Sequence, residues 1–146
     1  MLLSKRLRGE LRALSASATV EVRAPNRWGC VVQGPRGTPY EDAEFPVEIL
    51  FPPTYPFHSA PLRCTFEVPV FHCNVDANGR VCAAILPTPT PSMTVAHVLR
   101  QLEQLLAHCH LTPPLVPEIA DMYRTNRSRH DAIARAWTRA HATTDD

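Results

Sequence analysis

Apolar residues follow a helical period at the start of the chain and a strand-like pattern after it. Leu3, Leu7, Leu11 and Leu14 recur three or four positions apart among basic residues, and they predict an amphipathic helix over residues 2–15. Four segments rich in β-branched and aromatic residues follow, separated by turn residues. They are TVEVR (19–23), RWGCVVQ (27–33), FPVEILF (45–51) and LRCTFEV (62–68). Their short connections predict an antiparallel meander.

The helical period returns in the second half of the chain. Thr94 is a predicted N-cap, and an apolar stripe then continues to about Ala107. The segment PEIADMYR (117–124) starts with a proline that suits the first turn of a short helix.

A last helix is predicted from residue 127, with Asn126 as its cap and with Ile133 and Trp137 on its inner face. The order is one helix, four strands, an irregular segment and further helices. This order predicts a single α+β domain over residues 1–146, with helices packed on one antiparallel sheet.

Composition narrows the class of protein. Hydrophobic residues make up 45% of the 146 positions, enough for one core, and the net charge is only +1. Such a balance does not favour nucleic acid or a membrane as the main partner. The first residues have no apolar core of signal-peptide length, so we expect a soluble protein of the cytoplasm, and also of the nucleus. We further expect a monomer.

Five cysteines, an odd number at irregular spacing, favour free thiols over a disulfide framework. Cys30 and Cys64 lie in predicted strands, where a buried cysteine acts as a small hydrophobic residue. Cys73, Cys82 and Cys109 lie in or near irregular segments, where a reactive thiol finds partial exposure and polar neighbours.

One hypothesis is nucleophilic catalysis by Cys82. A thiolate attacks an activated carbonyl, forms a thioester and then passes the acyl group to another nucleophile. The attack creates an oxyanion that needs a preorganised donor, and the side-chain amide of Asn74 is a candidate. Asn78-Gly79 is a turn signal that can fold residue 74 back beside residue 82.

A structural zinc site is the competing hypothesis. Its candidate ligands are His72, Cys73, Cys82, His108, Cys109 and His110. The spacing is unlike that of known zinc motifs, because no C-x-x-C or H-x₃-H pair occurs, so we predict no bound metal.

Three stretches resemble the ubiquitin-conjugating enzymes: GPRGTPYEDAEFPVEILFPPTYPF, then HCN with NGRVC, then LVPEIADMYRTNR with AWT. The resemblance spans nearly the whole chain and implies the fold described above. It implies that Cys82, eight residues after Asn74, accepts ubiquitin or a ubiquitin-like protein as a thioester. Asn74 then stabilises the oxyanion or holds the loop, and His72 orders that loop. No cofactor is implied, since the activating enzyme uses the ATP.

The resemblance also implies where partners bind. The activating enzyme and the ligases would contact the first helix and two loops, at Lys5, Arg6, Phe57, Thr90, Pro91 and Ser92. The bound modifier would fold back on the central helix at His97, Arg100 and Gln104. The family often has an apolar residue at position 100, so an arginine there should weaken this closed arrangement.

Departures from the family pattern suggest how the modifier leaves. Lysine-directed members carry acidic residues at the positions of Ala84 and Pro113. A lysine amine, with its pKa near 10.4, needs help to lose a proton, whereas a thiol needs less. We therefore hypothesise transfer to a ligase cysteine of the HECT or RING-between-RING type, with lysine-directed transfer alongside RING ligases as the alternative.

Two further hypotheses concern the cysteines. Inactive relatives serve as non-catalytic scaffolds that bind the modifier, but they lack the cysteine that this chain retains. Cys73 occupies a slot where the family usually has proline, and an oxidative link between Cys73 and Cys82 needs to be checked.

Overall fold

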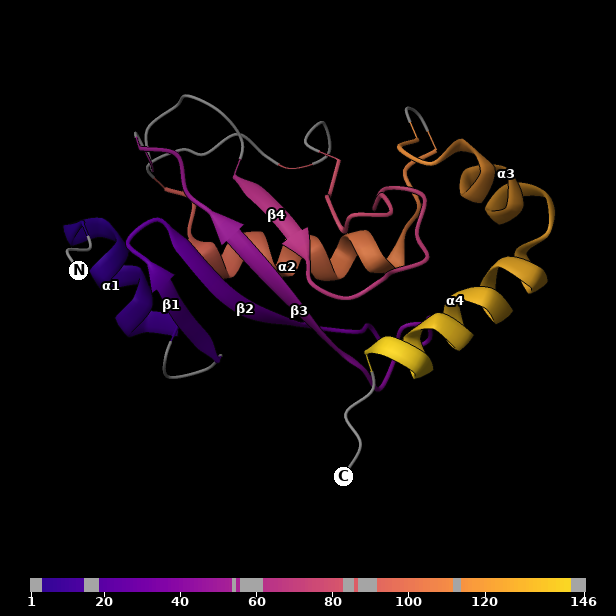
Figure 1. Cartoon of the computed structure of the whole chain (residues 1–146), viewed down its shortest axis with the longest axis horizontal. Helices are drawn as coiled ribbons and strands as arrows, with labels where there is room; N and C mark the ends of the chain where they lie inside the picture. The colour runs from indigo at the N-terminus through magenta and orange to yellow at the C-terminus, as the bar shows by residue number, and fades with distance from the viewer. Residues whose placement is uncertain are drawn as a thin grey trace.

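The helices and strands occur in the predicted order. The computed structural model describes residues 4–14, 19–53, 55, 62–82, 86, 92–111 and 114–142. The elements are α1 (Lys5–Leu14), β1 (Val20–Ala24), β2 (Arg27–Gln33), β3 (Glu44–Leu50), β4 (Arg63–Phe66), α2 (Val95–Ala107), α3 (Pro117–Thr125) and α4 (Arg127–His141). The four strands form one sheet in sequential order (Figure 1), which confirms the α+β class and the four-stranded meander.

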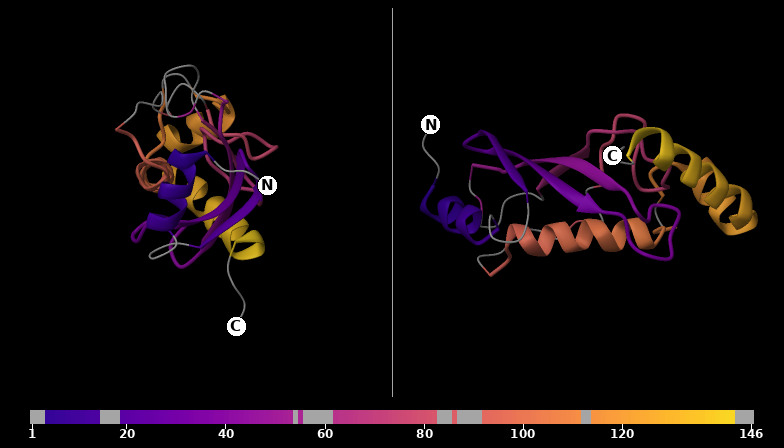
Figure 2. Two further views of the ribbon diagram at one scale, coloured as in Figure 1. Left: turned by 90° about the vertical axis from the view of Figure 1, so that its left-hand side faces the viewer. Right: turned by 90° about the horizontal axis from the view of Figure 1, so that it is seen from below.

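The sheet buries one face against α2. Alternate residues of β3, namely Phe45, Val47 and Ile49, are 0% exposed, as a strand with one covered face requires. Helix α2 contributes the apolar stripe predicted from the sequence, which includes Leu102 at 0% exposure. Figure 2 shows α2 running along this face, with α1 beyond one end of it and α3 and α4 beyond the other.

The opposite face of the sheet carries charges. Arg23 donates to Glu48 at 2.9 Å and to Glu67 at 2.7 Å, and it also pairs with Glu21. The α2 side of the sheet therefore holds the core, and the other side is polar.

Both predicted helix caps are confirmed. The Thr94 hydroxyl accepts a hydrogen bond from the backbone N–H of His97 at 3.2 Å, and the Asn126 side chain accepts from Arg129 at 3.3 Å. These bonds satisfy N–H groups that lack a partner within the helix. No helix in the described part of the chain is long and apolar enough to cross a membrane.

The prediction for the inner face of α4 is partly wrong. Ile133 is partly buried against the core, but Trp137 is 39% exposed. The buried positions are instead His130, Ala134 and Thr138, which lie one helical turn apart. Trp137 lies at the edge of this stripe, where its ring meets that of Phe71 at 5.3 Å between centroids.

A buried carboxylate joins α1 to the start of α2. Glu10 is 8% exposed and accepts from the backbone N–H of Val95 at 2.6 Å and from the Tyr55 hydroxyl at 2.5 Å. Arg6 pairs with Glu10 at 2.8 Å and donates to the Met93 carbonyl at 2.5 Å. Glu10 thus places a negative charge at the N-terminus of α2, where the helix dipole favours it.

Candidate active site

The turn between Asn74 and Cys82 folds as the sequence predicts. The Asp76 carboxylate accepts from the backbone N–H groups of Asn78 and Arg80, each at 2.9 Å. Gly79 has a φ of 82°, and an added Cβ would lie 2.0 Å from the Phe66 carbonyl, so glycine is needed there.

The consequence is a direct backbone contact between the two candidate residues. The Cys82 N–H donates to the Asn74 carbonyl at 3.1 Å, and Val75 and Val81 form a β-bridge just inside that pair. The two residues that the sequence analysis linked are therefore neighbours in space.

The Asn74 side chain holds the segment that follows α2. It is 0% exposed; its amide nitrogen donates to the His110 carbonyl at 3.0 Å, and its oxygen accepts from the His110 N–H at 2.8 Å. This two-bond pairing resembles one rung of a sheet. An amide nitrogen has two hydrogens, and the bond to His110 uses one of them.

His72 is fixed by three hydrogen bonds. Its Nε2 lies 2.6 Å from the Leu105 carbonyl and 3.1 Å from that of His108, and its Nδ1 accepts from the Asn74 N–H at 3.0 Å. The hydrogen therefore sits on Nε2. Burial lowers the pKa of His72 to about 4, since the charged ring would lack solvation, and the side chain is neutral at pH 7.

This buried histidine should make stability depend on pH. The unfolded chain binds a proton near pH 6.5 and the folded chain only near pH 4, so stability falls as the pH falls between these values. We expect His72 to account for a loss of about 3 kcal/mol in the free energy of unfolding over that window.

Urea unfolding at pH 7 and at pH 4 measures this loss. The His72→Gln variant should lose less stability on acidification than the wild type, while His141→Gln, at an exposed histidine, should behave like the wild type. Equal losses in the wild type and His72→Gln would contradict the assignment.

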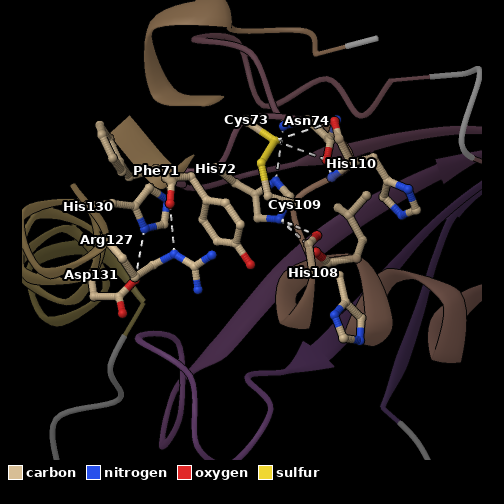
Figure 3. The surroundings of a disulfide bond; sticks show 12 residues. Phe71, His72, Cys73, Asn74, His108, Cys109, His110, Arg127, His130 and Asp131 are labelled. Carbon is tan, nitrogen blue, oxygen red and sulfur yellow. Dashed lines mark hydrogen bonds and ion pairs between the residues drawn. A yellow bond between two sulfur atoms is a disulfide. The ribbon is translucent and has the colours of Figure 1, made fainter. Parts of the chain in front are cut away.

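Two cysteines that were predicted to be free form a disulfide. Cys73 is bonded to Cys109, with their Cα atoms 6.0 Å apart (Figure 3). The prediction of free thiols is thus wrong for this pair, and Cys73 does not link to Cys82. The separation of 36 positions hid the pairing, because only the packing of the turn at residues 71–75 on the end of α2 brings the partners together.

The disulfide also weakens the zinc hypothesis. A disulfide sulfur is not a thiolate, so Cys73 and Cys109 are lost as ligands. Among the residues that the structure describes, no group of three histidine, cysteine or acidic side chains could hold a metal ion.

Cys82 differs from the other two free cysteines. Cys30 and Cys64 are each 3% exposed, and burial raises the pKa of Cys30 to about 11 and that of Cys64 to about 12. Cys82 is only half-buried. It is the most exposed of the three free cysteines.

The predicted partner surfaces are only partly described. Lys5 and Ser92 are exposed, whereas Arg6 is half-buried and engaged with Glu10. The other predicted positions, Phe57, Thr90, Pro91, Ala84 and Pro113, lie outside the described residues.

The predicted modifier contacts share one face of α2. His97 is half-buried, and Arg100 and Gln104 are exposed. Their spacing of three and four positions places them along one side of the helix.

The sequence analysis missed the backbone groups that complete this site. The carbonyls of Leu105 and His108 hold His72, and the N–H groups of Leu115 and Val116 both donate to the Cys73 carbonyl at 2.9 Å. The side chains of HCH at 108–110 suggested metal ligands, whereas the site uses the backbone of this segment. Backbone partners leave no residue-type signal, so only the folded structure identifies them.

Comparison with known proteins identifies the family to which this chain is similar. The family model described as ubiquitin-conjugating enzyme matches residues 6–138. Among solved structures, the E2 domain of a ubiquitin-conjugating enzyme from Toxoplasma gondii is 30% identical to this chain. The match covers 94% of this chain and 97% of that one, with a TM-score of 0.83. These matches confirm the resemblance seen in the sequence.

Proposed function

Because this chain belongs to the ubiquitin-conjugating enzyme family, we propose that Cys82 accepts ubiquitin or a ubiquitin-like protein from an activating enzyme as a thioester. The observation that carries this proposal is the half-buried free thiol of Cys82, held through its backbone against Asn74. The Cys82 thiolate attacks the thioester carbonyl on the activating enzyme, and that enzyme's thiolate leaves. The chain itself needs no cofactor for this exchange, since ATP is consumed by the activating enzyme.

Asn74 and His72 support the thioester chemistry in different ways. The pairing of the buried Asn74 side chain with the His110 backbone favours a loop-holding role. The alternative role, stabilising an oxyanion, would use the second hydrogen of its amide nitrogen. His72 is a neutral, fully engaged side chain, which suits ordering of the turn rather than proton transfer.

We further propose that Cys82 discharges mainly to a ligase cysteine. No acid stands at position 84 or 113 to orient and deprotonate a lysine. The exposure of Arg100 on α2 adds support, since a cation on the face that would receive the modifier weakens the closed arrangement used with RING ligases. HECT or RING-between-RING ligases fit this chemistry, because they accept the modifier on a thiol.

The partner surfaces and the compartment complete the proposal. Lys5, at the exposed start of α1, and Ser92, before α2, are the described candidates for contact with the activating enzyme or a ligase. Arg6 acts in the same region by holding α1 to α2. We place the protein in the cytoplasm or the nucleus, where conjugation takes place.

The test is discharge of the purified thioester. The chain is charged with an activating enzyme and a panel of modifiers, and the thioester is then exposed to equal amounts of free lysine or free cysteine. At pH 7 the reactive fraction of a thiol with its pKa near 8.5 exceeds that of a lysine amine by roughly 80-fold. We expect cysteine to discharge Cys82 faster than lysine by at least this factor.

A gain-of-function variant provides the matched control. Ala84→Asp restores an acid near Cys82 and should raise lysine discharge at least about tenfold while leaving cysteine discharge unchanged. Rapid lysine discharge of the wild type without a ligase would refute the proposed preference. Failure to charge with every modifier would refute the thioester proposal itself.

A further inference from the structure

We infer that the Cys73–Cys109 disulfide is a redox-controlled positioning element for Asn74 and the candidate active site. Its effect on the loop can be measured alone, and its effect on transfer rests on the proposed function. The pair lies between two sets of hydrogen bonds that already join the same two segments (Figure 3).

Residues 72–74 contact residues 108–110 one to one and in the same order. The His72 ring contacts the His108 carbonyl at 3.1 Å, Cys73 bonds Cys109, and the Asn74 amide pairs with the His110 backbone. The disulfide is the middle and covalent rung of this ladder. It therefore limits how far the segment at 108–110 can move away from Asn74.

The reduced form of the ladder is also compatible with burial. Cys73 is 0% exposed, and its sulfur lies 3.3 Å from the Asn74 side-chain oxygen and 3.7 Å from the His110 carbonyl. A thiol at that place has acceptors at hand, so reduction leaves no unpaired buried donor. Both redox states can thus be accommodated by the same fold.

Access is unequal at the two sulfurs. Cys109 is half-buried and lines a cavity of about 80 Å³ together with His72 and Arg127, whereas Cys73 is enclosed. Exchange therefore begins at Cys109, since attack requires access to the sulfur.

The reductant is a dithiol, and the step balances. Its thiolate attacks the Cys109 sulfur, the bond between the two protein sulfurs breaks, and Cys73 leaves as a thiolate that takes up a proton. The second thiol of the reductant then attacks the mixed disulfide and frees Cys109, which is also protonated. The protein gains two electrons and two protons, and the reductant leaves as a disulfide. Disulfides in reducing compartments are commonly of this transient, redox-sensing kind.

Hydrogen exchange at the His110 amide reports whether the disulfide holds the segment at 108–110 against Asn74. That N–H donates to Asn74, so it exchanges only when the segment opens. We expect its exchange to be at least about threefold faster in protein reduced with a phosphine than in oxidised protein. Alkylation with mass detection should count three free thiols in the oxidised protein and five after reduction.

Two variants separate the effect of the disulfide from that of the Cys82 thiol. Cys109→Ser should exchange like reduced wild type and ignore the phosphine, while Cys82→Ser, which retains the disulfide, should respond like the wild type. Charging and discharge are then measured without thiol reductants. In that assay Cys109→Ser should transfer its modifier at least about threefold more slowly than oxidised wild type.

Several outcomes would overturn the inference. Five free thiols in untreated protein would show that the disulfide does not form. Equal His110 exchange in both redox states would show that the disulfide does not hold the segment at 108–110 against Asn74. Equal transfer rates in Cys109→Ser and oxidised wild type would remove its effect on the site. If Cys82 never charges, the proposed function fails, but the exchange measurement still tests whether the disulfide holds the loop.

Discussion

Replacement of Cys82 by alanine is expected to abolish charging by the activating enzyme completely. The other two free cysteines cannot take over, because Cys30 and Cys64 are each 3% exposed and burial raises the pKa of both. Cys73 and Cys109 carry no free thiol while they are bonded. The measurement is the thiol-sensitive band of the conjugate on a non-reducing gel.

Controls can separate loss of the nucleophile from loss of the fold. Cys82→Ser should give either a thiol-resistant oxyester or no conjugate, and Cys30→Ala should charge like the wild type. A Cys82→Ala variant that still forms a thiol-sensitive conjugate would show that another cysteine is the acceptor. An uncharged wild type with an intact fold would favour the scaffold alternative.

Replacement of Glu10 by alanine should lower the free energy of unfolding by about 3–5 kcal/mol, because it removes the buried carboxylate from an ion pair that joins α1 to the start of α2. Three groups each lose a hydrogen bond to Glu10 at once: the Arg6 guanidinium, which keeps its bond to the Met93 carbonyl, the Tyr55 hydroxyl and the Val95 N–H. The last of these also loses the charge that favours the start of α2. Urea denaturation at pH 7 measures the loss.

Matched variants identify the origin of that loss. Glu10→Gln preserves the shape of the side chain and one acceptor oxygen, so we expect a smaller loss than with alanine. Glu118→Ala removes an exposed glutamate from the first turn of α3 and should cost no more than about 1 kcal/mol. A loss below about 1 kcal/mol for Glu10→Ala would show that the cluster contributes little to stability.

A signal for Glu10 was present in the sequence. Position 10 lies on the same face of α1 as Leu7 and Leu14, and all three are buried. A charged residue inside an apolar stripe indicates that another part of the chain binds its side chain. The stripe could not reveal that this partner is the N-terminus of a helix 85 residues away.

The sequence alone determined the order of the elements, both predicted helix caps and the turn that returns Cys82 to Asn74. These features depend on neighbouring residues: Thr94 and Asn126 cap the N–H groups that follow them, and Gly79 supplies a backbone angle within its own turn. The interactions that form caps and turns join residues a few positions apart, so a short sequence pattern suffices to predict these features.

Only the tertiary structure decided the Cys73–Cys109 bond, the anchoring of Asn74 on the His110 backbone and the half-exposed edge position of Trp137. Each of the first two joins residues 36 positions apart, and the third depends on how α4 meets the rest of the core. Residue types and spacing do not encode such contacts, because a long loop can close in many ways and the packing of the whole domain selects one of them.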